Sequence, residues 1–449
     1  MDVGSTAFIL AATMAVALMI PGLALFYGGM VSSKGVLNMI MMVFGAVAVV
    51  GMLWTLFGFS AVFGDSYGGA GLLGDVTEYA GLGSLVAGDE AAALPPALVA
   101  VFQALFAVIT TALIAGAVSS RVRFGPWLVF AGLWAALVYF PVAHWVFAFD
   151  SADGSVSGGW IANTLGAVDF AGGTAVHINA GLGALALVLV VGKRVGWPRQ
   201  ARPTNLPLVA LGAGMLWFGW FGFNGGSALA AGNSAAVVML TTFNATCGAI
   251  LAWLLVEKLR DGHATTLGGM SGAIAGLVAI TPSCGAVTPL GALAVGAIAG
   301  ALCPLAIALK YRFGYDDSLD VVGVHLAGGI IGTLLVGFFG SAEAPSGRAG
   351  LFYGGGLDLL ADQAIATVAV VAYSFTVSLL IAFALHKTLG LRVSPEAEAA
   401  GIDLDQHAEV AFDLEGSVQT PGTAPTPQAV VASAEALVAR SAAEGQPTS

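Results

Sequence analysis

The sequence predicts an all-α polytopic membrane protein with eleven transmembrane helices, most of them arranged as an inverted repeat. First, 58% of the 449 residues are hydrophobic and 9% are charged, whereas soluble domains carry roughly 25% charged residues. Second, many apolar runs reach the length of about 20 residues that a helix needs to cross a bilayer. Third, two distant stretches share one pattern, with a single histidine inside an apolar run.

Polar and Gly/Pro-rich turns separate the predicted spans. These are 6–28, 37–63, 97–119, 126–149, 172–192, 206–229, 235–256, 265–281, 288–309, 320–340 and 364–387. The first run has no basic residues ahead of it and no clear cleavage site, and it contains Pro21-Gly22. We therefore predict an uncleaved span rather than a signal peptide. The three cysteines, Cys247, Cys284 and Cys303, show no metal-ligand spacing and predict no disulfide framework.

Basic residues predict the orientation of the chain. Fourteen of the 15 Lys and Arg residues lie in the odd-numbered junctions or in the C-terminal tail, and only Arg348 lies in an even-numbered junction. The positive-inside rule then places the N-terminus outside and the C-terminus in the cytoplasm. The expected location is the inner (plasma) membrane, with multiple passes.

The shared pattern lies in Asp169–Gly183 and Asp317–Gly329. His177 and His325 each follow an aspartate by eight residues, and they fall on the fifth and tenth spans. These spans run in opposite directions, so spans 1–5 and 6–10 form two inverted halves, with span 11 outside them. Such a repeat usually places a site near the midplane between its halves. An ionisable residue inside the membrane is itself a sign of function.

Two further features support the repeat. The first half carries Phe26-Tyr27-Gly28-Gly29 on span 1, and the second carries Phe223-Asn224-Gly225-Gly226 on span 6. Asp169 and Asp317 both stand at helix entrances, where a carboxylate can cap free amides and complement the helix dipole.

The polar chemistry available inside the spans is that of two imidazoles. A lone intramembrane histidine is a satisfied core residue about as often as it is a functional residue. The paired context of these two histidines favours a functional site. Neutral imidazoles can donate to and accept from each other and a small polar molecule. The sequence shows no ring of charges such as a pore for hydrated ions needs. It also shows no nucleophile–base pair or metal cluster, so we expect neither an enzyme nor a cofactor.

Aromatic residues gather at the outward ends of the spans. They are Phe106, Trp145, Phe147, Trp220 and Phe223. Aromatic residues at that depth usually form an interface belt. The alternative is a cation site, because aromatic faces attract a small cation and a hydroxyl such as that of Ser227 can accept from it. A cation held at the mouth of an apolar pore with two histidines is chemistry suited to ammonium.

The sequence resembles the Amt/Mep/Rh ammonium transporter family, on the bacterial Amt side, over most of residues 6–412. The motifs are FYGGMV at 26–31, FQALFAVIT at 102–110, YFPVAHWVF at 139–147, DFAGGTAVHINAG at 169–181, WFGFNGGS at 220–227 and DDSLDVVGVH at 316–325. The resemblance implies a homotrimer of eleven-helix protomers, with one pore in each. It also implies roles for single residues: His177 and His325 as the twin pore histidines, Phe106 and Phe223 as the aromatic gate, Trp220 and Ser227 in the outer ammonium vestibule, and Asp169 as its supporting acid.

The chain departs from the family pattern at several positions. Phe147 stands where the vestibule usually has a cation-binding Trp, and the neighbouring Trp145 is expected to point elsewhere on the helix. Thr111 replaces a common Pro, and Ser120 a common Glu. In the tail, Ala408 and Phe412 replace a Gly and a Tyr. The change at Phe147 bears on the strength of ammonium recruitment.

The resemblance implies that NH4+ is recruited, loses a proton near the gate and crosses as NH3, with or without separate return of the proton along the histidines. Methylammonium is the expected analogue. The sequence leaves net NH3 and net NH4+ transport open. The alternative function is an ammonium sensor that signals through its tail.

We divide the chain into a membrane domain, 1–387, and a cytoplasmic tail, 388–449. Within the tail we expect residues 392–415 to dock and residues 416–449 to be mostly disordered. The docking segment is acidic, and we expect it to face the basic junctions Lys193–Arg202 and Lys258–Arg260. The resemblance implies that the tail also contacts a neighbouring protomer and lies beside the surface that binds a P-II nitrogen-regulatory protein.

Overall fold

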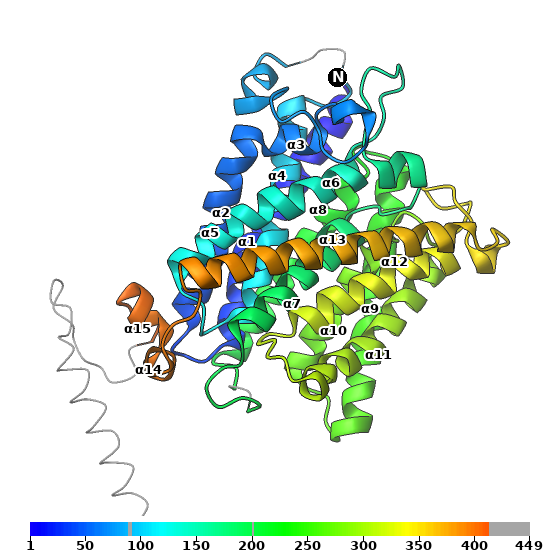
Figure 1. Ribbon diagram of the computed structural model, residues 1–449. Helices are drawn as coiled ribbons and strands as arrows, with labels where there is room; N and C mark the ends of the chain where they lie inside the picture. Colours follow the sequence, from blue (N-terminus) through cyan, green and yellow to red (C-terminus); the bar gives the residue numbers. More distant parts are fainter. Residues whose placement is uncertain (89–91, 200–201, 413–449) are drawn as a thin grey trace, which may run out of the picture.

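The computed structural model describes residues 1–88, 92–199 and 202–412 (Figure 1). The regular elements of this part of the chain are helices, with a few isolated β-bridges. Within the described residues, ten helical segments are long and apolar enough to cross a membrane. They are Val3–Met30 (α1), Val36–Phe63 (α2, η1 and α3), Pro96–Val118 (α4 and η4), Phe124–Phe147 (α5, η5 and α6), Gly173–Val191 (η7 and α7), Leu206–Gly226 (α8), Asn233–Asp261 (α9), Pro289–Phe313 (α11), Val322–Phe339 (η8 and α12) and Asp358–Thr388 (α13). Each coincides with a predicted span.

The remaining predicted span, 265–281, corresponds to the shorter helix α10 (Thr266–Ile280). Its 15 residues extend for about 22 Å, less than the roughly 30 Å of a bilayer's hydrocarbon core. Most of its side chains are buried, and it packs against α8, α9, α11 and α12. A helix enclosed by protein on these sides does not have to match the membrane thickness. The described residues thus contain ten helical segments of membrane-spanning length and one shorter helix at the place of the predicted span 265–281, which supports the predicted count approximately.

The first helices of the two halves, α1 and α8, lie against each other along their length. Two glycines of α8 permit this approach. A Cβ added at Gly212 would lie 2.4 Å from the backbone nitrogen of Phe26, and one at Gly222 would lie 2.6 Å from the backbone oxygen of Ala12. A larger residue at either position would push the helices apart, which is the reason that membrane helix interfaces use small residues.

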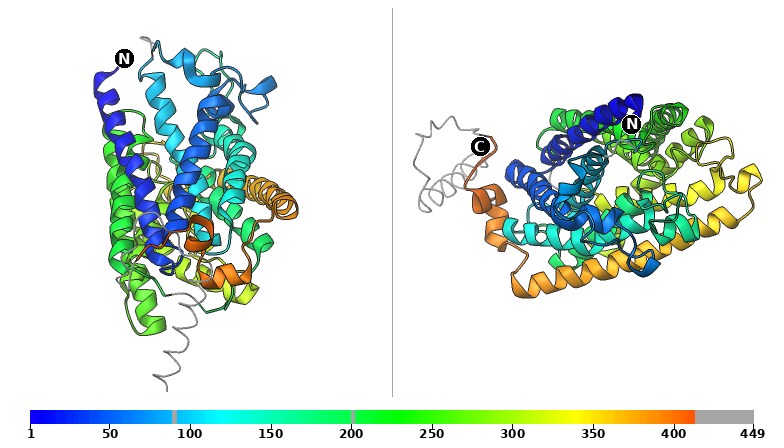
Figure 2. Two further views of the ribbon diagram at one scale, coloured as in Figure 1. Left: turned by 90° about the vertical axis from the view of Figure 1, so that its left-hand side faces the viewer. Right: turned by 90° about the horizontal axis from the view of Figure 1, so that it is seen from above.

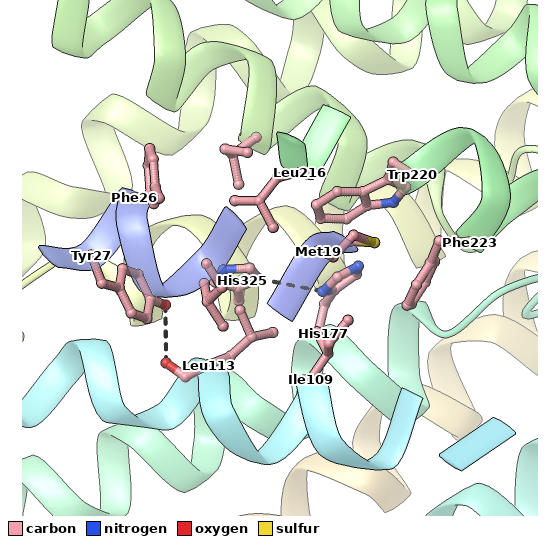
Figure 3. Close-up of a pocket in the computed structure, with 12 residues that line it drawn as sticks. Met19, Phe26, Tyr27, Ile109, Leu113, His177, Leu216, Trp220, Phe223 and His325 are labelled. Carbon is pink, nitrogen blue, oxygen red and sulfur yellow. Dashed lines mark hydrogen bonds between the residues drawn. The ribbon is translucent and has the colours of Figure 1, made fainter. Parts of the chain in front are cut away.

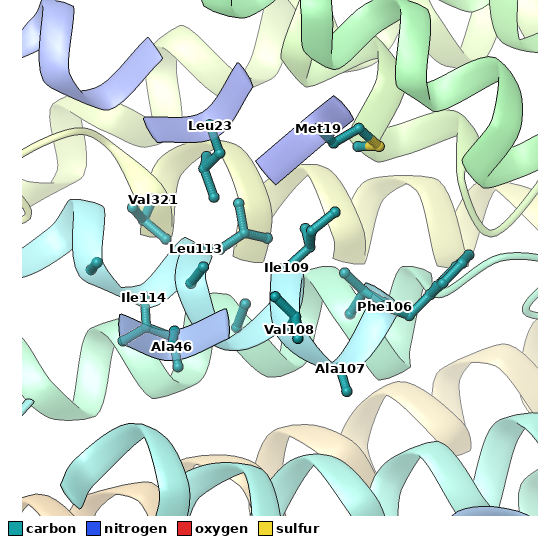
Figure 4. Packing of buried hydrophobic residues seen from close by; sticks show 14 of the residues in the cluster. Met19, Leu23, Ala46, Phe106, Ala107, Val108, Ile109, Leu113, Ile114 and Val321 are labelled. Atoms are coloured by element: carbon teal, nitrogen blue, oxygen red, sulfur yellow. The ribbon is translucent and has the colours of Figure 1, made fainter. Parts of the chain in front are cut away.

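Buried apolar side chains, most of those labelled coming from the first half, pack against one another in the interior (Figure 4). Met19 and Leu23 of α1 and Ile109 and Leu113 of α4 belong to one buried cluster, and each is less than 5% exposed. The same four side chains line the cavity that also contains His177 and His325.

Helix α13 lies outside the inverted repeat and crosses the outer side of the bundle (Figures 1 and 2). It contacts α5, α7, α12 and the segment that carries His177. Its position allows one helix to touch parts of both halves.

The described part of the tail contains two short helices, α14 (Pro395–Ala400) and α15 (Ile402–His407). Helix α15 docks where two membrane helices begin. The buried carboxylate of Asp403 accepts hydrogen bonds from the backbone nitrogens of Leu37 (3.0 Å) and Asn38 (2.7 Å) in the first turn of α2. The side-chain oxygen of Gln406 accepts from the nitrogen of Phe124, the first residue of α5 (2.9 Å). Neither α2 nor α5 has a side-chain cap of its own, so the tail supplies the missing acceptors.

The predicted electrostatic docking is therefore only partly correct. The carboxylate of Glu398 accepts from the nitrogen of Val195, within the expected basic junction (2.7 Å). In contrast, Lys258 and Arg260 bond to Gly262 and Asp261 of their own junction. They lie at the end of α9, where a cation complements the helix dipole and the free carbonyls. The tail residues from 413 onward, including the segment predicted to be disordered, lie outside the described residues.

Candidate functional site

Both aspartates of the repeated pattern cap the start of their histidine segment. The carboxylate of Asp169 accepts hydrogen bonds from the backbone nitrogens of Gly172 (2.8 Å), Gly173 (2.6 Å) and Thr174 (2.7 Å). The carboxylate of Asp317 accepts hydrogen bonds from the backbone nitrogens of Val321 (3.1 Å) and Val322 (2.7 Å), where the helical segment of His325 begins. The predicted capping is observed in both halves, and it satisfies amides that would otherwise be unpaired.

Each histidine lies in a π-helical turn at the start of its span. His177 belongs to η7 (Gly173–Ile178) and His325 to η8 (Val322–Leu326). Such wide turns are rare and occur frequently at functional sites. The structure brings the two imidazoles together as the pattern predicted, and their Nδ1 atoms lie 3.3 Å apart (Figure 3).

The short contact constrains the protons of the pair. At this distance one Nδ1 donates and the other accepts, so two neutral rings must be in opposite tautomers. The Nε2 atom of His177 is buried and has no hydrogen-bond partner within the described residues. Figure 3 shows the outer part of this ring turned toward Trp220 and Phe223. A buried nitrogen without a partner is costly, and it is available to a small polar molecule.

The histidines line a narrow cavity that is otherwise mainly apolar. Its lining residues are Met19, Leu23, Phe26, Tyr27, Ile109, Leu113, His177, Leu216, Trp220, Phe223, Ile274 and His325. The volume open to the centres of water-sized molecules is about 20 Å³, enough for only one or two such molecules. The hydroxyl of Tyr27 already donates to the carbonyl of Leu113 (3.0 Å). The imidazole nitrogens are therefore the main polar groups that this cavity offers.

Two stacked phenylalanines close the His177 side of the cavity. The rings of Phe106 and Phe223 lie 3.9 Å apart at 21°, and both side chains are buried. Phe147 meets Phe106 edge-on, with 6.4 Å between ring centroids. The hydroxyl of Ser227 donates to the carbonyl of Phe223 (2.8 Å), which leaves its oxygen free to accept. The two predicted gate residues thus lie close to Phe147 and Ser227, on one side of the histidines.

Trp220 does not lie in the outer vestibule, where we expected it. Its ring stacks on His177 with 5.6 Å between centroids, and it lines the histidine cavity. The physical reason is helix geometry. On α8, Trp220 precedes Phe223 by about one turn and Ser227 by about two turns, so it lies on the histidine side of the stacked rings of Phe106 and Phe223. Its indole nitrogen donates to the hydroxyl of Thr281 (2.9 Å), which fixes the ring.

The structure also locates residues that the sequence analysis did not assign. A second cavity adjoins His325 and is lined in part by Phe26, Tyr27 and Asp320. Phe26 thus stands beside His325 while Phe223 stands beside His177, as the matching FYGG and FNGG motifs place them in an inverted repeat. That echo was the signal available in the sequence for assigning Phe26 and Tyr27 to the site.

Trp145 does not substitute for the Trp that is absent at position 147. Its indole nitrogen donates to the carbonyl of Leu72 (2.8 Å), and its ring packs on Trp160 and Tyr373. The expectation that Trp145 points elsewhere is therefore correct, and Phe147 is the aromatic residue beside the gate.

We predict that Phe147→Trp lowers the half-saturating ammonium concentration several-fold. An indole face holds a small cation more strongly than a phenyl face, by about 0.5–1 kcal/mol at a partly wet site. The measurement is the concentration dependence of ammonium uptake, with Phe149→Trp, an exposed position nearby, as the control. If the half-saturating concentration stays unchanged, Phe147 does not contact the cation.

The fold and the site define a class of protein. It is a multi-pass helical membrane protein with a buried, mainly apolar cavity, in which two paired imidazoles lie behind an aromatic stack. The family model described as Ammonium Transporter Family matches residues 7–412. The chain therefore belongs to the ammonium transporter family.

An ammonium transporter of Mycobacterium tuberculosis (strain H37Rv) is 54% identical, covering 94% of this chain and 93% of its own. One of Corynebacterium glutamicum is 45% identical, covering 92% and 90%. Among solved structures, Saccharomyces cerevisiae Mep2 is 34% identical with a TM-score of 0.79, covering 88% of each chain. A structure titled "Sensor Amt Protein" is 29% identical with a TM-score of 0.82, covering 90% of this chain and 98% of that one.

Proposed function

We propose that the protein carries ammonium across the inner (plasma) membrane, with its N-terminus outside, by recruiting NH4+ and passing NH3 over the two histidines. The observation that carries this proposal is the pair of imidazoles at 3.3 Å in a mainly apolar cavity, behind the stacked rings of Phe106 and Phe223. A small neutral molecule with both donor and acceptor capacity suits that cavity, and a hydrated ion does not.

Recruitment takes place outside the stack. The cation lies against the faces of Phe106 and Phe147 and donates to the hydroxyl oxygen of Ser227. Asp169 acts from a distance, because its carboxylate already accepts from several donors at the start of η7. Its negative charge favours a cation nearby and stabilises the segment that carries His177.

Loss of the proton accompanies passage through the stack. The buried gate excludes water, and an ammonium ion without its hydration shell is costly in hydrocarbon. Removing neutral ammonia from water costs much less free energy. The Nε2 atom of His177 can then serve as its hydrogen-bond partner on the inner side of the stack. The proton passes to water outside the stack and stays there, or it crosses separately along the histidine pair and rejoins the ammonia on the inner side.

A flux assay with purified protein in liposomes tests the proposal. We expect protein-dependent uptake of ammonium and methylammonium, with little passage of K+ or Na+. Recording current and internal pH together distinguishes net NH4+ from net NH3 movement. Proteoliposomes with no more flux than empty liposomes would contradict a transport function.

We further propose a homotrimer with one pore in each protomer, and a P-II protein as a partner at the face that carries the tail. Native mass spectrometry tests the trimer, and co-purification under nitrogen-replete conditions tests the partner. An ammonium sensor is not favoured as the function, since the curated relatives at 45% and 54% identity are named ammonium transporters.

A further inference from the structure

The side chain of Gln363 on α13 is completely buried and makes three hydrogen bonds. Its oxygen accepts from the backbone nitrogen of Val168 (2.6 Å), and its nitrogen donates to the backbone oxygens of Val168 (2.7 Å) and Thr333 (3.0 Å). The amide thus holds both backbone groups of one loop residue and a third group on another helix. No sequence motif singled this residue out.

These contacts join the two histidine segments. Val168 immediately precedes Asp169, the residue that caps η7 and thus the segment of His177. Thr333 lies on α12, about two turns beyond His325. Gly173 of η7 also approaches this helix closely, since a Cβ there would lie 2.8 Å from the hydroxyl oxygen of Thr333.

A second contact holds the same loop two residues earlier. The guanidinium of Arg348 donates to the carbonyl of Gly166 and pairs with Asp362 (3.0 Å), the residue before Gln363. Arg348 is the one basic residue that the sequence analysis placed in an even-numbered junction, on the outer side of the membrane. The loop of residues 166–168 is therefore anchored to the beginning of α13 at both of its ends.

The opposite half anchors its matching loop differently. Asp316 precedes the capping residue Asp317 as Val168 precedes Asp169. Arg121 donates to the carbonyl of Asp316, and Arg194 binds its carboxylate at 2.8 Å. Burial lowers the pKa of Arg121 to about 10, so it remains charged at neutral pH. At these matching positions, charged side chains from within the repeat hold Asp316, whereas a neutral amide from the helix outside the repeat holds Val168.

We propose that Gln363 is a positioning residue for ammonium recruitment: by fixing Val168 it places the Asp169 carboxylate, and with it the start of η7, beside the outer mouth. This inference rests on the transport function proposed above. Gln363 suits the task because its amide matches one donor and two acceptors in a site closed to water. An apolar side chain there would leave those backbone groups unpaired.

The first test is Gln363→Leu. Leucine removes all three hydrogen bonds, and only part of that loss reaches the Asp169 carboxylate. We therefore expect the half-saturating methylammonium concentration to rise by about three- to tenfold, comparable to the loss of one net hydrogen bond. The maximal rate per protein should change less. The matched control is Ser378→Ala on the same helix, which removes the buried hydroxyl that accepts from the indole of Trp134 (2.8 Å). An equal shift in both variants, or no shift in Gln363→Leu, would overturn the proposal.

Gln363→Glu keeps the shape and serves if the leucine variant does not assemble. A carboxyl at this position can donate to a carbonyl only when protonated. A protonated carboxyl restores one of the two donated hydrogen bonds, so the ratio of the variant's half-saturating concentration to that of the wild type should be lowest at acid pH and rise toward alkaline pH. A pH-independent ratio would reject the role of the donated hydrogen bonds.

A double-mutant cycle with Asp169→Asn tests the route. If Gln363 acts through Asp169, the two changes in half-saturation should be clearly less than additive. Full additivity would overturn this route. Wild-type proteoliposomes run in parallel separate the two proposals: without wild-type flux the transport function itself fails, whereas wild-type flux with unshifted Gln363 variants rejects only this inference.

Discussion

His177→Ala or His325→Ala is expected to change the ammonium transport rate by about tenfold, or to admit other cations, while the protein still assembles. Each substitution removes one partner of the 3.3 Å imidazole contact. A hydrogen bond in an apolar passage contributes roughly 1–1.5 kcal/mol, and 1.36 kcal/mol on a barrier corresponds to a tenfold change in rate. The cavity would also widen, so that water could enter beside the remaining ring.

The measurement is proteoliposome flux of ammonium, methylammonium and K+ at equal protein content. His144→Ala is the matched control. It removes an equally buried imidazole, whose Nδ1 is bonded to the carbonyl of Val62 at 2.7 Å, outside the histidine cavity. We expect that control to lower stability and to leave selectivity unchanged. Unaltered flux and selectivity in both single variants of the pair would show that the histidines are only core residues.

Deleting residues 392–449 is expected to leave protein that inserts normally but transports poorly, and Asp403→Ala should reproduce much of this loss. The Asp403 carboxylate caps the first turn of α2, and loss of an N-cap costs about 0.5–2 kcal/mol. A cost of about 1–2 kcal/mol lowers the ratio of docked to undocked tail by about 5–30-fold. Helix α2 would then lose the acceptors that hold its start, on the side of the protein where the cavities around Asp320 open.

Hydrogen exchange at the amides of Leu37 and Asn38 reports docking directly, and flux at equal membrane abundance reports the consequence. Glu409→Ala is the control, because it removes an exposed acid from the same tail. Deletion of 416–449 alone should have little effect, since that sequence has no apolar pattern able to bury itself. Full activity after the longer deletion would leave the tail without a role in transport.

The number and position of the spans could be predicted because the bilayer imposes a local rule. A segment in hydrocarbon must satisfy its own backbone and present apolar side chains, and both requirements are visible in about 20 consecutive residues. The same rule does not apply to a helix enclosed by protein, which explains why α10 is only 15 residues long. Its length depends on its neighbours α9 and α11, which the sequence around it does not describe.

The histidine pair could be predicted for a related reason. His177 and His325 are ionisable groups in apolar runs, and each follows an aspartate, Asp169 or Asp317, by eight residues. The placement of Trp220 could not be obtained in this way, because residues one helical turn apart can lie on opposite sides of a gate. Only the stacked rings of Phe106 and Phe223 define where the vestibule ends and the cavity begins.

The sequence by itself determined the position of the spans, the inverted halves, the capping aspartates and the paired histidines. Each of these features follows from local hydropathy or from a repeated spacing of residues. The tertiary structure alone decided the contact between the two Nδ1 atoms, the depth of Trp220, the capping of α2 by Asp403 and the hold of Gln363 on Val168. Each of these joins residues far apart in the chain through one or a few hydrogen bonds or ring contacts. Such contacts depend on how helices pack, and no local pattern of residues specifies that packing.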